Sequence, residues 1–336
     1  MNINAHNIEQ EIFKVNNAAF EALALQIFLW QYQKNNIYQQ FCNALHIIPQ
    51  EVTSIEQIPF LPIQFFKSKE IFTTVFKPAI TFESSGTTGS INSRHEVKDI
   101  LIYEKSFKKT FNLFYGDITK YCVIGLLPSY LERGNSSLVY MVNELIKNSG
   151  SEKSGFYLQD YEKLNRTLLQ NEAAGIPTLL IGVTYALLDF SEKFPVYLKH
   201  TIVMETGGMK GRRQELTREE VHTQLKKYLG ITKVHSEYGM TELLSQAYSN
   251  GDGIFKCPPW MKILTRAEDD PFNVVSSKQA GGKWAAGLLN IIDLANMYSC
   301  AFIATDDVGK LFADGSFEVM GRLDNSDMRG CGLMLL

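Results

Sequence analysis

Apolar residues near the amino terminus recur at the spacing of an amphipathic helix. They fall every three or four positions between residues 8 and 32, so that one face of a helix would collect them and pack on a core. The residues concerned are Ile8, Ile12, Phe13, Phe20, Leu23, Ile27 and Phe28. Residues 58–66, IPFLPIQFF, hold two prolines in an apolar run. Because proline lacks an N–H donor and restricts the residue before it, this segment predicts an extended, buried connection.

Helical and strand patterns alternate further along the chain. The predicted helices span residues 99–115, 136–148, 184–193 and 217–229. Thr217 opens the last of them, with Glu220 three residues on, which is the spacing of a capping box. Short runs that are apolar throughout lie between the helices, at 121–127, 178–183 and 200–205. Strands of this kind, separated by helices, indicate an α/β fold in which helices cover both faces of a sheet.

The pattern changes to strands and turns after residue 254. Residues 285–293, 300–305 and 316–320 are predicted strands, and Asp314-Gly315 favours a hairpin turn. We therefore expect an α/β core over residues 1–250 and a smaller β-rich subdomain over residues 251–336.

Composition excludes several classes of protein. The 336 residues are 45% hydrophobic and 21% charged, as in a globular protein, and the net charge of −3 gives no electrostatic case for a nucleic-acid partner. The amino terminus lacks the pattern of a signal peptide, and no apolar run is long enough for a transmembrane segment. Five cysteines without a CxxC pair argue against a zinc site or a disulfide framework. We expect a cytoplasmic protein.

Residues 82–90, FESSGTTGS, form the first segment with candidate chemistry. Glycines let a backbone approach an anion closely, and successive N–H groups and hydroxyls can then hold a phosphate. The segment does not have the GxxxxGK[ST] pattern of a Walker loop. An ordinary flexible turn is the alternative interpretation.

Residues 235–242, HSEYGMTE, form the second segment. Its carboxylate, Glu242, suits Mg²⁺, which takes one or two carboxylates together with phosphate oxygens. The alternative is a loop that enters a helix, with Thr241 and Glu242 as capping groups of the first turn.

Acidic turn segments follow at 304–311 (ATDDVGKL) and 321–333 (GRLDNSDMRGCGL). Their carboxylates could accept hydrogen bonds from a ribose diol. Asp and Gly are also common in turns that bind nothing, which is the alternative here.

The four segments together resemble the adenylate-forming superfamily of acyl-CoA synthetases and related ligases, because SSGTTG, YGMTE, TDDVG and GRLDxxxxRG occur in that family's order. Further stretches are similar to the LuxE-type acyl-protein synthetases, relatives of phenylacetate–CoA ligase. These stretches cover nearly the whole chain, at 59–71, 126–141, 204–212, 255–263 and the terminal RGCGLMLL. The resemblance implies the adenylate-forming large-domain fold, with helix-covered sheets and a smaller β-rich subdomain, and without the mobile carboxy-terminal domain.

The resemblance also implies roles for single residues. The loop that holds the ATP phosphates matches Ser84, Ser85, Gly86, Thr87, Thr88 and Gly89. The residues around adenine match Tyr238, Gly239, Gly207 and Gly208. Thr241 matches the residue near the α-phosphate and Glu242 the Mg²⁺ ligand. Asp307 matches the carboxylate that binds the ribose hydroxyls, supported by Arg322, and Asp324 matches the hinge.

Two departures from the wider superfamily affect the expected mechanism. The phosphate loop is followed by SINSRH, in which Arg94 is the only nearby cation where a lysine is usual. The chain also ends about 15 residues after the hinge motif begins at Gly321, so we expect the domain with the usual catalytic lysine to be missing. Lys210 is a candidate substitute for this catalytic lysine. Cys331 matches the acyl-accepting cysteine of LuxE-type proteins, and Arg329 and Arg322 would favour its thiolate.

The predicted function is therefore ATP- and Mg²⁺-dependent activation of a carboxylic acid, with a fatty acid as the expected class. The acid would form acyl-AMP and then an acyl thioester on Cys331, with Thr241 and Glu242 as the other catalytic residues. The acyl group would pass to a partner reductase or an acyl carrier protein. One alternative is an aryl- or acyl-CoA ligase of the phenylacetate type, with CoA as the acceptor. A non-enzymatic alternative is a nucleotide-binding partner subunit.

Overall fold

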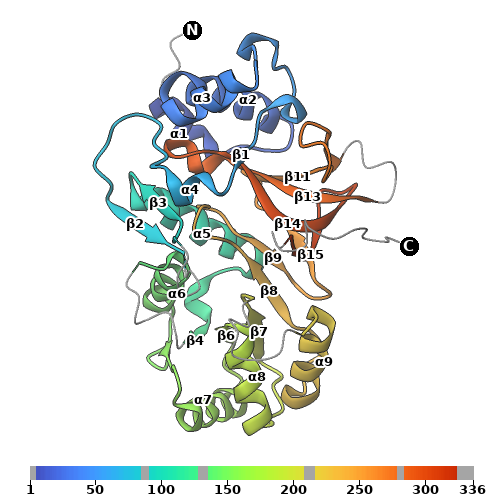
Figure 1. Cartoon of the computed structure of the whole chain (residues 1–336). Coiled ribbons are helices and arrows are strands. Elements are labelled where there is room, and N and C mark those ends of the chain that lie inside the picture. Colours follow the sequence, from blue (N-terminus) through green and yellow to red (C-terminus); the bar gives the residue numbers. More distant parts are fainter. Residues whose placement is uncertain (1–4, 85–90, 128–134, 208–215, 278–283, 324–336) are drawn as a thin grey trace. The chain divides into compact units, whose positions relative to one another are not determined.

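The computed structural model describes residues 5–84, 91–127, 135–207, 216–277 and 284–323 (Figure 1). The chain divides by its internal contacts into two compact units. The first contains residues 1–65, 71–74 and 259–336, and the second contains residues 66–70 and 75–258. This grouping differs from a single division at residue 250, because the amino-terminal helices pack with the carboxy-terminal strands.

The first unit combines three helices with an antiparallel sheet. The helices are α1 (Ala5–Ile12), α2 (Phe20–Lys34) and α3 (Asn36–Ala44), and two 3₁₀ turns follow, η1 (Pro49–Glu51) and η2 (Ile55–Gln57). The strands run in the order β12 (Val274–Val275), β11 (Met261–Arg266), β13 (Trp284–Asp293), β14 (Phe302–Phe312) and β15 (Phe317–Arg322). A short strand, β1 (Leu61–Pro62), pairs in parallel with the start of β14.

The single helix predicted over residues 8–32 is two helices, so this prediction was wrong in its continuity. The side chain of Asn16 accepts hydrogen bonds from the backbone N–H groups of Ala18 and Ala19, at 3.1 and 3.0 Å. Asparagine competes in this way with the helical hydrogen bonds of the backbone, and the chain breaks between α1 and α2.

Gln31 ties α2 to the carboxy-terminal part of the first unit. It is fully buried, and its Nε2 donates to the carbonyls of Asn296 and Met297, at 3.1 and 2.9 Å. Both carbonyls belong to the 3₁₀ helix η5 (Leu294–Tyr298). The backbone N–H of Ala301 donates to Oε1 of the same side chain. Both ends of this buried amide are therefore satisfied, as a stable core requires.

The second unit is built on parallel strands. These are β4 (Cys122–Leu126), β6 (Thr178–Gly182), β7 (Thr201–Glu205) and β8 (His235–Tyr238), adjacent in that order. The short strand β5 (Gly155–Phe156) pairs in parallel with β4. Antiparallel strands β9 (Ala247–Ser249) and β10 (Ile254–Lys256) follow β8. Strands β4 and β6 are buried throughout, which confirms the prediction of a covered α/β sheet.

The helices of the second unit connect these strands. They are α5 (Ile100–Tyr115), α6 (Ser137–Asn148), α7 (Tyr161–Ala174), α8 (Thr184–Lys193) and α9 (Arg218–Leu229), and Figure 1 shows them around β4, β6 and β7. The helices predicted at 99–115, 136–148, 184–193 and 217–229 are thereby confirmed to within one residue at each end. The capping box of Thr217 and Glu220 is formed. Helix α7 and strands β9, β10, β11 and β12 were not predicted.

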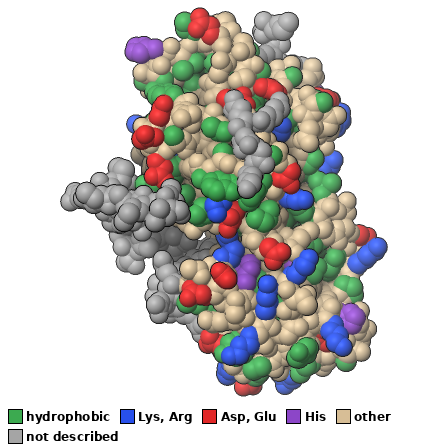
Figure 2. Space-filling view, turned by 90° about the vertical axis from the view of Figure 1, so that its right-hand side faces the viewer, with side chains coloured by type: hydrophobic (Ala, Val, Ile, Leu, Met, Phe, Trp, Pro, Cys, Tyr) green, Lys and Arg blue, Asp and Glu red, His purple; other side chains and the backbone are tan. Residues whose placement is uncertain are grey.

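A short helix and a hairpin complete the second unit's amino-terminal part. Helix α4 (Phe65–Ser68) begins inside the segment predicted to be extended, of which β1 is the extended part. Strands β2 (Ile80–Glu83) and β3 (Arg94–Val97) pair antiparallel with each other, and the 3₁₀ turn η3 (Ile118–Lys120) precedes β4. On the face drawn in Figure 2, acidic and basic side chains are interspersed, which agrees with a net charge near zero. Across the described residues, no helix has the length and apolarity needed to span a bilayer.

Candidate active site

Several of the predicted nucleotide residues in the second unit, among them Gly207, Gly239 and Thr241, follow the carboxyl ends of its parallel strands. Strands β6, β7 and β8 end at Gly182, Glu205 and Tyr238, and Gly182 lies opposite Glu205 in the sheet register. Gly207 comes two residues after β7, with a positive φ of 72° that favours glycine. In open α/β sheets, ligands bind beyond this edge. Gly207, Gly239 and Thr241 therefore lie at the edge of the sheet where this type of fold favours a ligand.

Ser84 and Ser93 join the two ends of the predicted phosphate loop. The backbone N–H of Ser84 donates to the carbonyl of Ser93 at 3.0 Å, and the backbone N–H of Ser93 donates to Oγ of Ser84 at 2.8 Å. These bonds extend the β2–β3 hairpin by one step beyond the pair Glu83 and Arg94. Of the predicted loop residues, Ser85, Gly86, Thr87, Thr88 and Gly89 lie outside the described residues.

Arg94, the cation that follows this loop, is balanced by two carboxylates. Its Nη2 lies 2.9 Å from Oε1 of Glu96, and its Nε lies 4.0 Å from Oε1 of Glu83. Glu96 is buried, whereas about half of the Arg94 side chain is exposed. A phosphate at Arg94 would therefore compete with carboxylates that already neutralise its charge.

His95 makes a contact with the second motif that sequence reasoning missed. It is buried, and its Nδ1 lies 2.8 Å from the backbone carbonyl of Thr241. A carbonyl can only accept, so Nδ1 carries the proton. Burial lowers the pKa of His95 to about 4, although the Thr241 contact works against this shift, and the ring is neutral. Its Nε2 has no hydrogen-bond partner among the described residues. The sequence offered no signal for this pairing beyond the position of His95 after the loop.

No helix follows β8, so the alternative interpretation of a loop that enters a helix is wrong. Residues 239–246 form a turn at Thr241 and Glu242 and then lead into β9. A side chain at Gly239 would place its Cβ 2.5 Å from Oε1 of Glu237, so a larger residue there would displace that carboxyl group. The glycine is thus required by a close approach rather than by a positive φ.

Glu242 is 5% exposed and provides one carboxylate at this turn. Within the described part of the chain, no group of three or more His, Cys, Asp or Glu side chains is placed to hold a metal ion. A single carboxylate nevertheless fits Mg²⁺ when nucleotide phosphates supply further oxygens, since this ion is usually held in that way. The residues present are compatible with such an ion and not with a cage made of protein ligands alone.

Glu205 and Glu237 are buried carboxyl groups near the ends of the adjacent strands β7 and β8, and the charge of one affects the other. Burial raises the pKa of Glu237 to about 8, and the negative charge of Glu205 adds to this effect. For Glu205, burial works in the same direction, but contacts with His222, Ser236, Arg218 and the backbone N–H of Gly207 outweigh it and hold its pKa below the ordinary value. That N–H donates to Oε2 of Glu205 at 2.6 Å. At neutral pH, Glu205 is ionised and Glu237 is protonated.

Tyr238, the residue expected beside adenine, is half-buried at the end of β8. Its ring centroid lies 5.9 Å from that of Phe255, and the guanidinium of Arg218 lies 5.3 Å from the Phe255 ring. These contacts leave the adenine role of Tyr238 as a prediction.

Asp307 and Arg322 lie in the first unit, opposite each other on β14 and β15. Nε of Arg322 donates to Oδ1 of Asp307 at 3.0 Å. Asp307 is 7% exposed, whereas most of the Arg322 side chain is accessible. The arginine thus fixes the orientation of a buried carboxylate through a charge-assisted hydrogen bond. Binding of the ribose remains a prediction.

Cys331, Gly208, Lys210 and Asp324 lie outside the described residues. Among the described cysteines, Cys42 and Cys300 are buried, and burial raises the pKa of each thiol to about 12. Such thiols are protonated and unreactive.

Solved structures of adenylate-forming ligases share this fold. A 2-hydroxyisobutyryl-CoA ligase, in the postadenylation state with R3-HIB-AMP, aligns with a TM-score of 0.63 and 10% identity over 94% of this chain and 70% of its own. ATP-bound MatB from Rhodopseudomonas palustris aligns with a TM-score of 0.53 and 16% identity over 75% of this chain. The chain spans about half the length of the MatB structure. The chain therefore has the fold of these ligases.

The family is defined by sequence. The family model for acyl-protein synthetase, LuxE, matches residues 9–336, and the chain belongs to that family. The chain is also similar to a long-chain-fatty-acid–luciferin-component ligase from Aliivibrio fischeri, with 23% identity over 94% of this chain and 87% of the relative.

Proposed function

We propose that this protein uses ATP to activate a fatty acid and then carries the acyl group on Cys331. A carboxylate oxygen of the acid attacks the α-phosphorus of ATP, the bond to the β-phosphate oxygen breaks, and pyrophosphate leaves. The Cys331 thiolate then attacks the acyl carbon, and AMP leaves with the bonding electrons. Membership of the acyl-protein synthetase family is the observation that carries this proposal. The name of the Aliivibrio relative supports a long-chain fatty acid as the substrate class.

Several residues would each contribute to the formation of acyl-AMP. Ser84 begins the loop proposed to hold the phosphates, and Thr241 would contact the α-phosphate. Glu242 would hold Mg²⁺, which neutralises charge on the leaving pyrophosphate when it is bound. Asp307, oriented by Arg322, would bind the ribose. The chain's contribution is mainly position and charge, because phosphoryl-type transfer depends on both.

The test separates the two half-reactions. ATP–pyrophosphate exchange is measured across a panel of fatty acids of different chain length and of aryl acids. Wild-type protein and Cys331→Ser are then incubated with ATP and a radiolabelled acid. We expect exchange in both proteins and protein-bound label in wild type alone. Absence of exchange with every acid would contradict the activation step and favour a nucleotide-binding partner subunit.

An acyl-CoA ligase is the second candidate, and the fold it shares with a CoA ligase supports it. In that case wild type would show no stable protein-bound label, and turnover would require CoA. The release of AMP with and without CoA, in the same assay, distinguishes the two. The acceptor beyond Cys331 is proposed to be a reductase or an acyl carrier protein.

A further inference from the structure

A cleft of about 600 Å³ lies wholly within the first unit. It is bounded by the end of α3, the segment through η1 and η2, the hairpin of β11 and β12, and β14. Its walls are mainly apolar and include Phe41, Leu45, Ile48, Val52, Phe60 and Phe272. Ligand sites in proteins have this size and this character.

One end of the cleft is polar and rigidly built. Nε2 of Gln64 lies 2.7 and 2.8 Å from the two carboxylate oxygens of Asp306. The buried guanidinium of Arg266 donates to the carbonyls of Leu289 and Thr305, at 3.2 and 2.6 Å, and to Oδ1 of Asn290 at 2.6 Å. These bonds hold Arg266 in place and direct its donors to oxygens of its own unit. Arg266 and Asp306 thus bring opposite charges to this end of the cleft. Asp306 is the one of the two that can accept a hydrogen bond from an occupant.

The cleft is separate from the proposed ribose site. Asp306 and Asp307 are consecutive residues of β14, in a stretch where the register with β13 shifts between Ala304 and Val308. Asp307 faces Arg322, whereas Asp306 faces the cleft.

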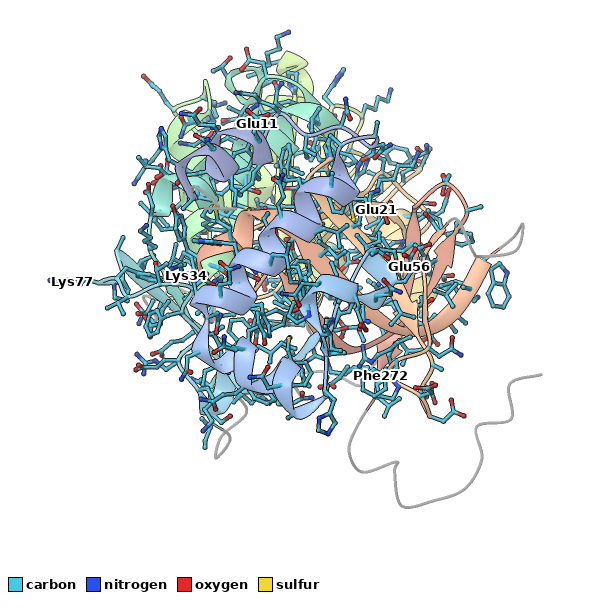
Figure 3. The ribbon with its side chains drawn as sticks, turned by 90° about the horizontal axis from the view of Figure 1, so that it is seen from above. Glu11, Glu21, Lys34, Glu56, Lys77 and Phe272 are labelled. Atoms are coloured by element: carbon cyan, nitrogen blue, oxygen red, sulfur yellow. The ribbon has the colours of Figure 1, made fainter. Side chains whose placement is uncertain are left out.

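The rim combines negative charge with exposed apolar side chains. Glu51 and Glu56 line the cleft together with Asp306, and Glu268, Asp269 and Asp270 are exposed in the loop that leads to Phe272. Figure 3 labels Glu56 and Phe272 on the two segments that border it. Ile48 and Phe272 are 53% and 61% exposed. Such a rim repels anions, including the carboxylate of a fatty acid, and attracts cations beside apolar groups.

Asp306 also connects the cleft to the cysteine-bearing end of the chain. Its backbone carbonyl accepts a hydrogen bond from the backbone N–H of Leu323, at 2.8 Å. Cys331 follows Leu323 by eight residues in the sequence. Eight residues span at most about 27 Å, so a protein bound in the cleft would lie within reach of the thioester.

We propose that this cleft docks the acyl-accepting partner protein through a segment in which large apolar side chains alternate with Lys or Arg. The apolar side chains would fill the cleft between Ile48 and Phe272, and a basic side chain would reach Asp306. The role of this partner as the acyl acceptor rests on the proposed function. The binding of such a segment does not.

The probe is a short fluorescein-labelled amphipathic peptide of leucine and lysine, titrated with the full chain and followed by fluorescence anisotropy. A peptide of leucine and glutamate with the same pattern tests the charge preference. There are two cleft variants. The first combines Ile48→Ser and Phe272→Ser, which are changes of exposed side chains, and the second is Glu51→Lys. The matched controls are Leu169→Ser and Glu162→Lys, at exposed positions of α7 in the other unit.

We expect the leucine–lysine peptide to bind wild type and both controls equally. Its affinity should fall about tenfold or more in the cleft variants, as for other central apolar contacts, and the leucine–glutamate peptide should not bind. Equal affinity for wild type and cleft variants would overturn the proposal. So would binding of dodecylammonium but not of the peptide, which would assign the cleft to a small amphiphile.

Pyrophosphate exchange, measured on the same variants, distinguishes failure of the docking site from failure of the proposed function. Exchange should be unchanged in the cleft variants, because Ile48, Glu51 and Phe272 are not among the residues proposed to bind the nucleotide. Peptide binding without exchange in wild type would reject the proposed function and leave the docking site standing. Exchange in wild type without cleft-dependent peptide binding would reject the docking site and leave the proposed function standing.

Discussion

Nδ1 of His95 lies 2.8 Å from the carbonyl oxygen of Thr241, a contact between residues 146 positions apart in the sequence. It links strand β3, which leaves the predicted phosphate loop, to the turn that carries Thr241 and Glu242. The ring of Phe66 lies edge-on to His95, with ring centroids 5.7 Å apart. We infer that His95 positions the turn through the backbone of Thr241 and does not itself contact ATP.

Replacing His95 by phenylalanine should slow adenylation and lower stability. The change leaves the Thr241 carbonyl without its donor, which costs about 1–3 kcal/mol for a buried group. Pyrophosphate exchange should show a lower kcat together with a higher KM for ATP, and chemical unfolding should show the stability loss. His95→Gln, which can still donate to the carbonyl, should restore part of both. A phenylalanine variant with unchanged exchange kinetics would contradict the positioning role.

The pKa of His95 predicts an acid-sensitive contribution to stability. Burial lowers this pKa to about 4 in the folded protein, whereas the ordinary value is 6.5. The unfolded chain therefore takes up a proton first as the pH falls, and the folded state loses stability from about pH 6.5 down to about pH 4. Urea unfolding at a series of pH values should show this loss, and it should be smaller in His95→Gln. An identical pH profile for both proteins would reject this assignment.

The raised pKa of Glu237 predicts that stability falls as the pH rises, which is opposite to the effect of His95. Its pKa is raised from 4.5 to about 8, so the folded state holds a proton that the unfolded chain releases above pH 4.5. The resulting penalty grows as the pH rises to about 8. Glu237→Gln, which keeps a neutral side chain at all pH values, should therefore be more stable than wild type near pH 8 and unfold at a higher urea concentration. Near pH 4, the two proteins should unfold at similar urea concentrations.

Asp307 and its neighbour Asp306 provide a matched test of the ribose site. Asp307→Asn keeps the shape of the side chain but removes its charge, and hydrogen bonds to charged groups are worth about 1.5–3 kcal/mol. We expect the KM for ATP in pyrophosphate exchange to rise about tenfold or more. Asp306→Asn, at the residue that lines the cleft, should leave this KM unchanged. Equal effects of the two substitutions would contradict the assignment of Asp307.

The sequence allowed the elements with strong local signals to be predicted. Helix α9 has its capping box, and β4 and β6 are apolar throughout, so local chemistry determines these elements. Helix α7 was missed because its sequence, YEKLNRTLLQNEAA, is largely polar and buries mainly Leu164 and Leu168 among its apolar residues. The break between α1 and α2 depends on the side chain of Asn16, which an apolar pattern does not include.

The candidate site was predictable only as a set of motifs. Their order along the chain identified the family, which the family model confirms. The contact of His95 with Thr241 and the effect of the Glu205 charge on the pKa of Glu237 depend on packing between distant segments. No spacing within the sequence encodes such contacts, so these features required the structure.

Gln31 also has a consequence for how the protein is made. Its partners, Asn296 and Met297, are 265 and 266 residues further along the chain. During synthesis, helix α2 is complete long before the ribosome has produced the carbonyls that satisfy this buried amide. Other side chains of α2 also have late partners, because the Phe28 ring lies 6.3 Å from that of Phe302, and Nζ of Lys262 lies 4.4 Å from the centre of the Phe20 ring. Because domains generally fold as units, the second unit can form first, while the amino-terminal helices need protection from aggregation until the last strands emerge.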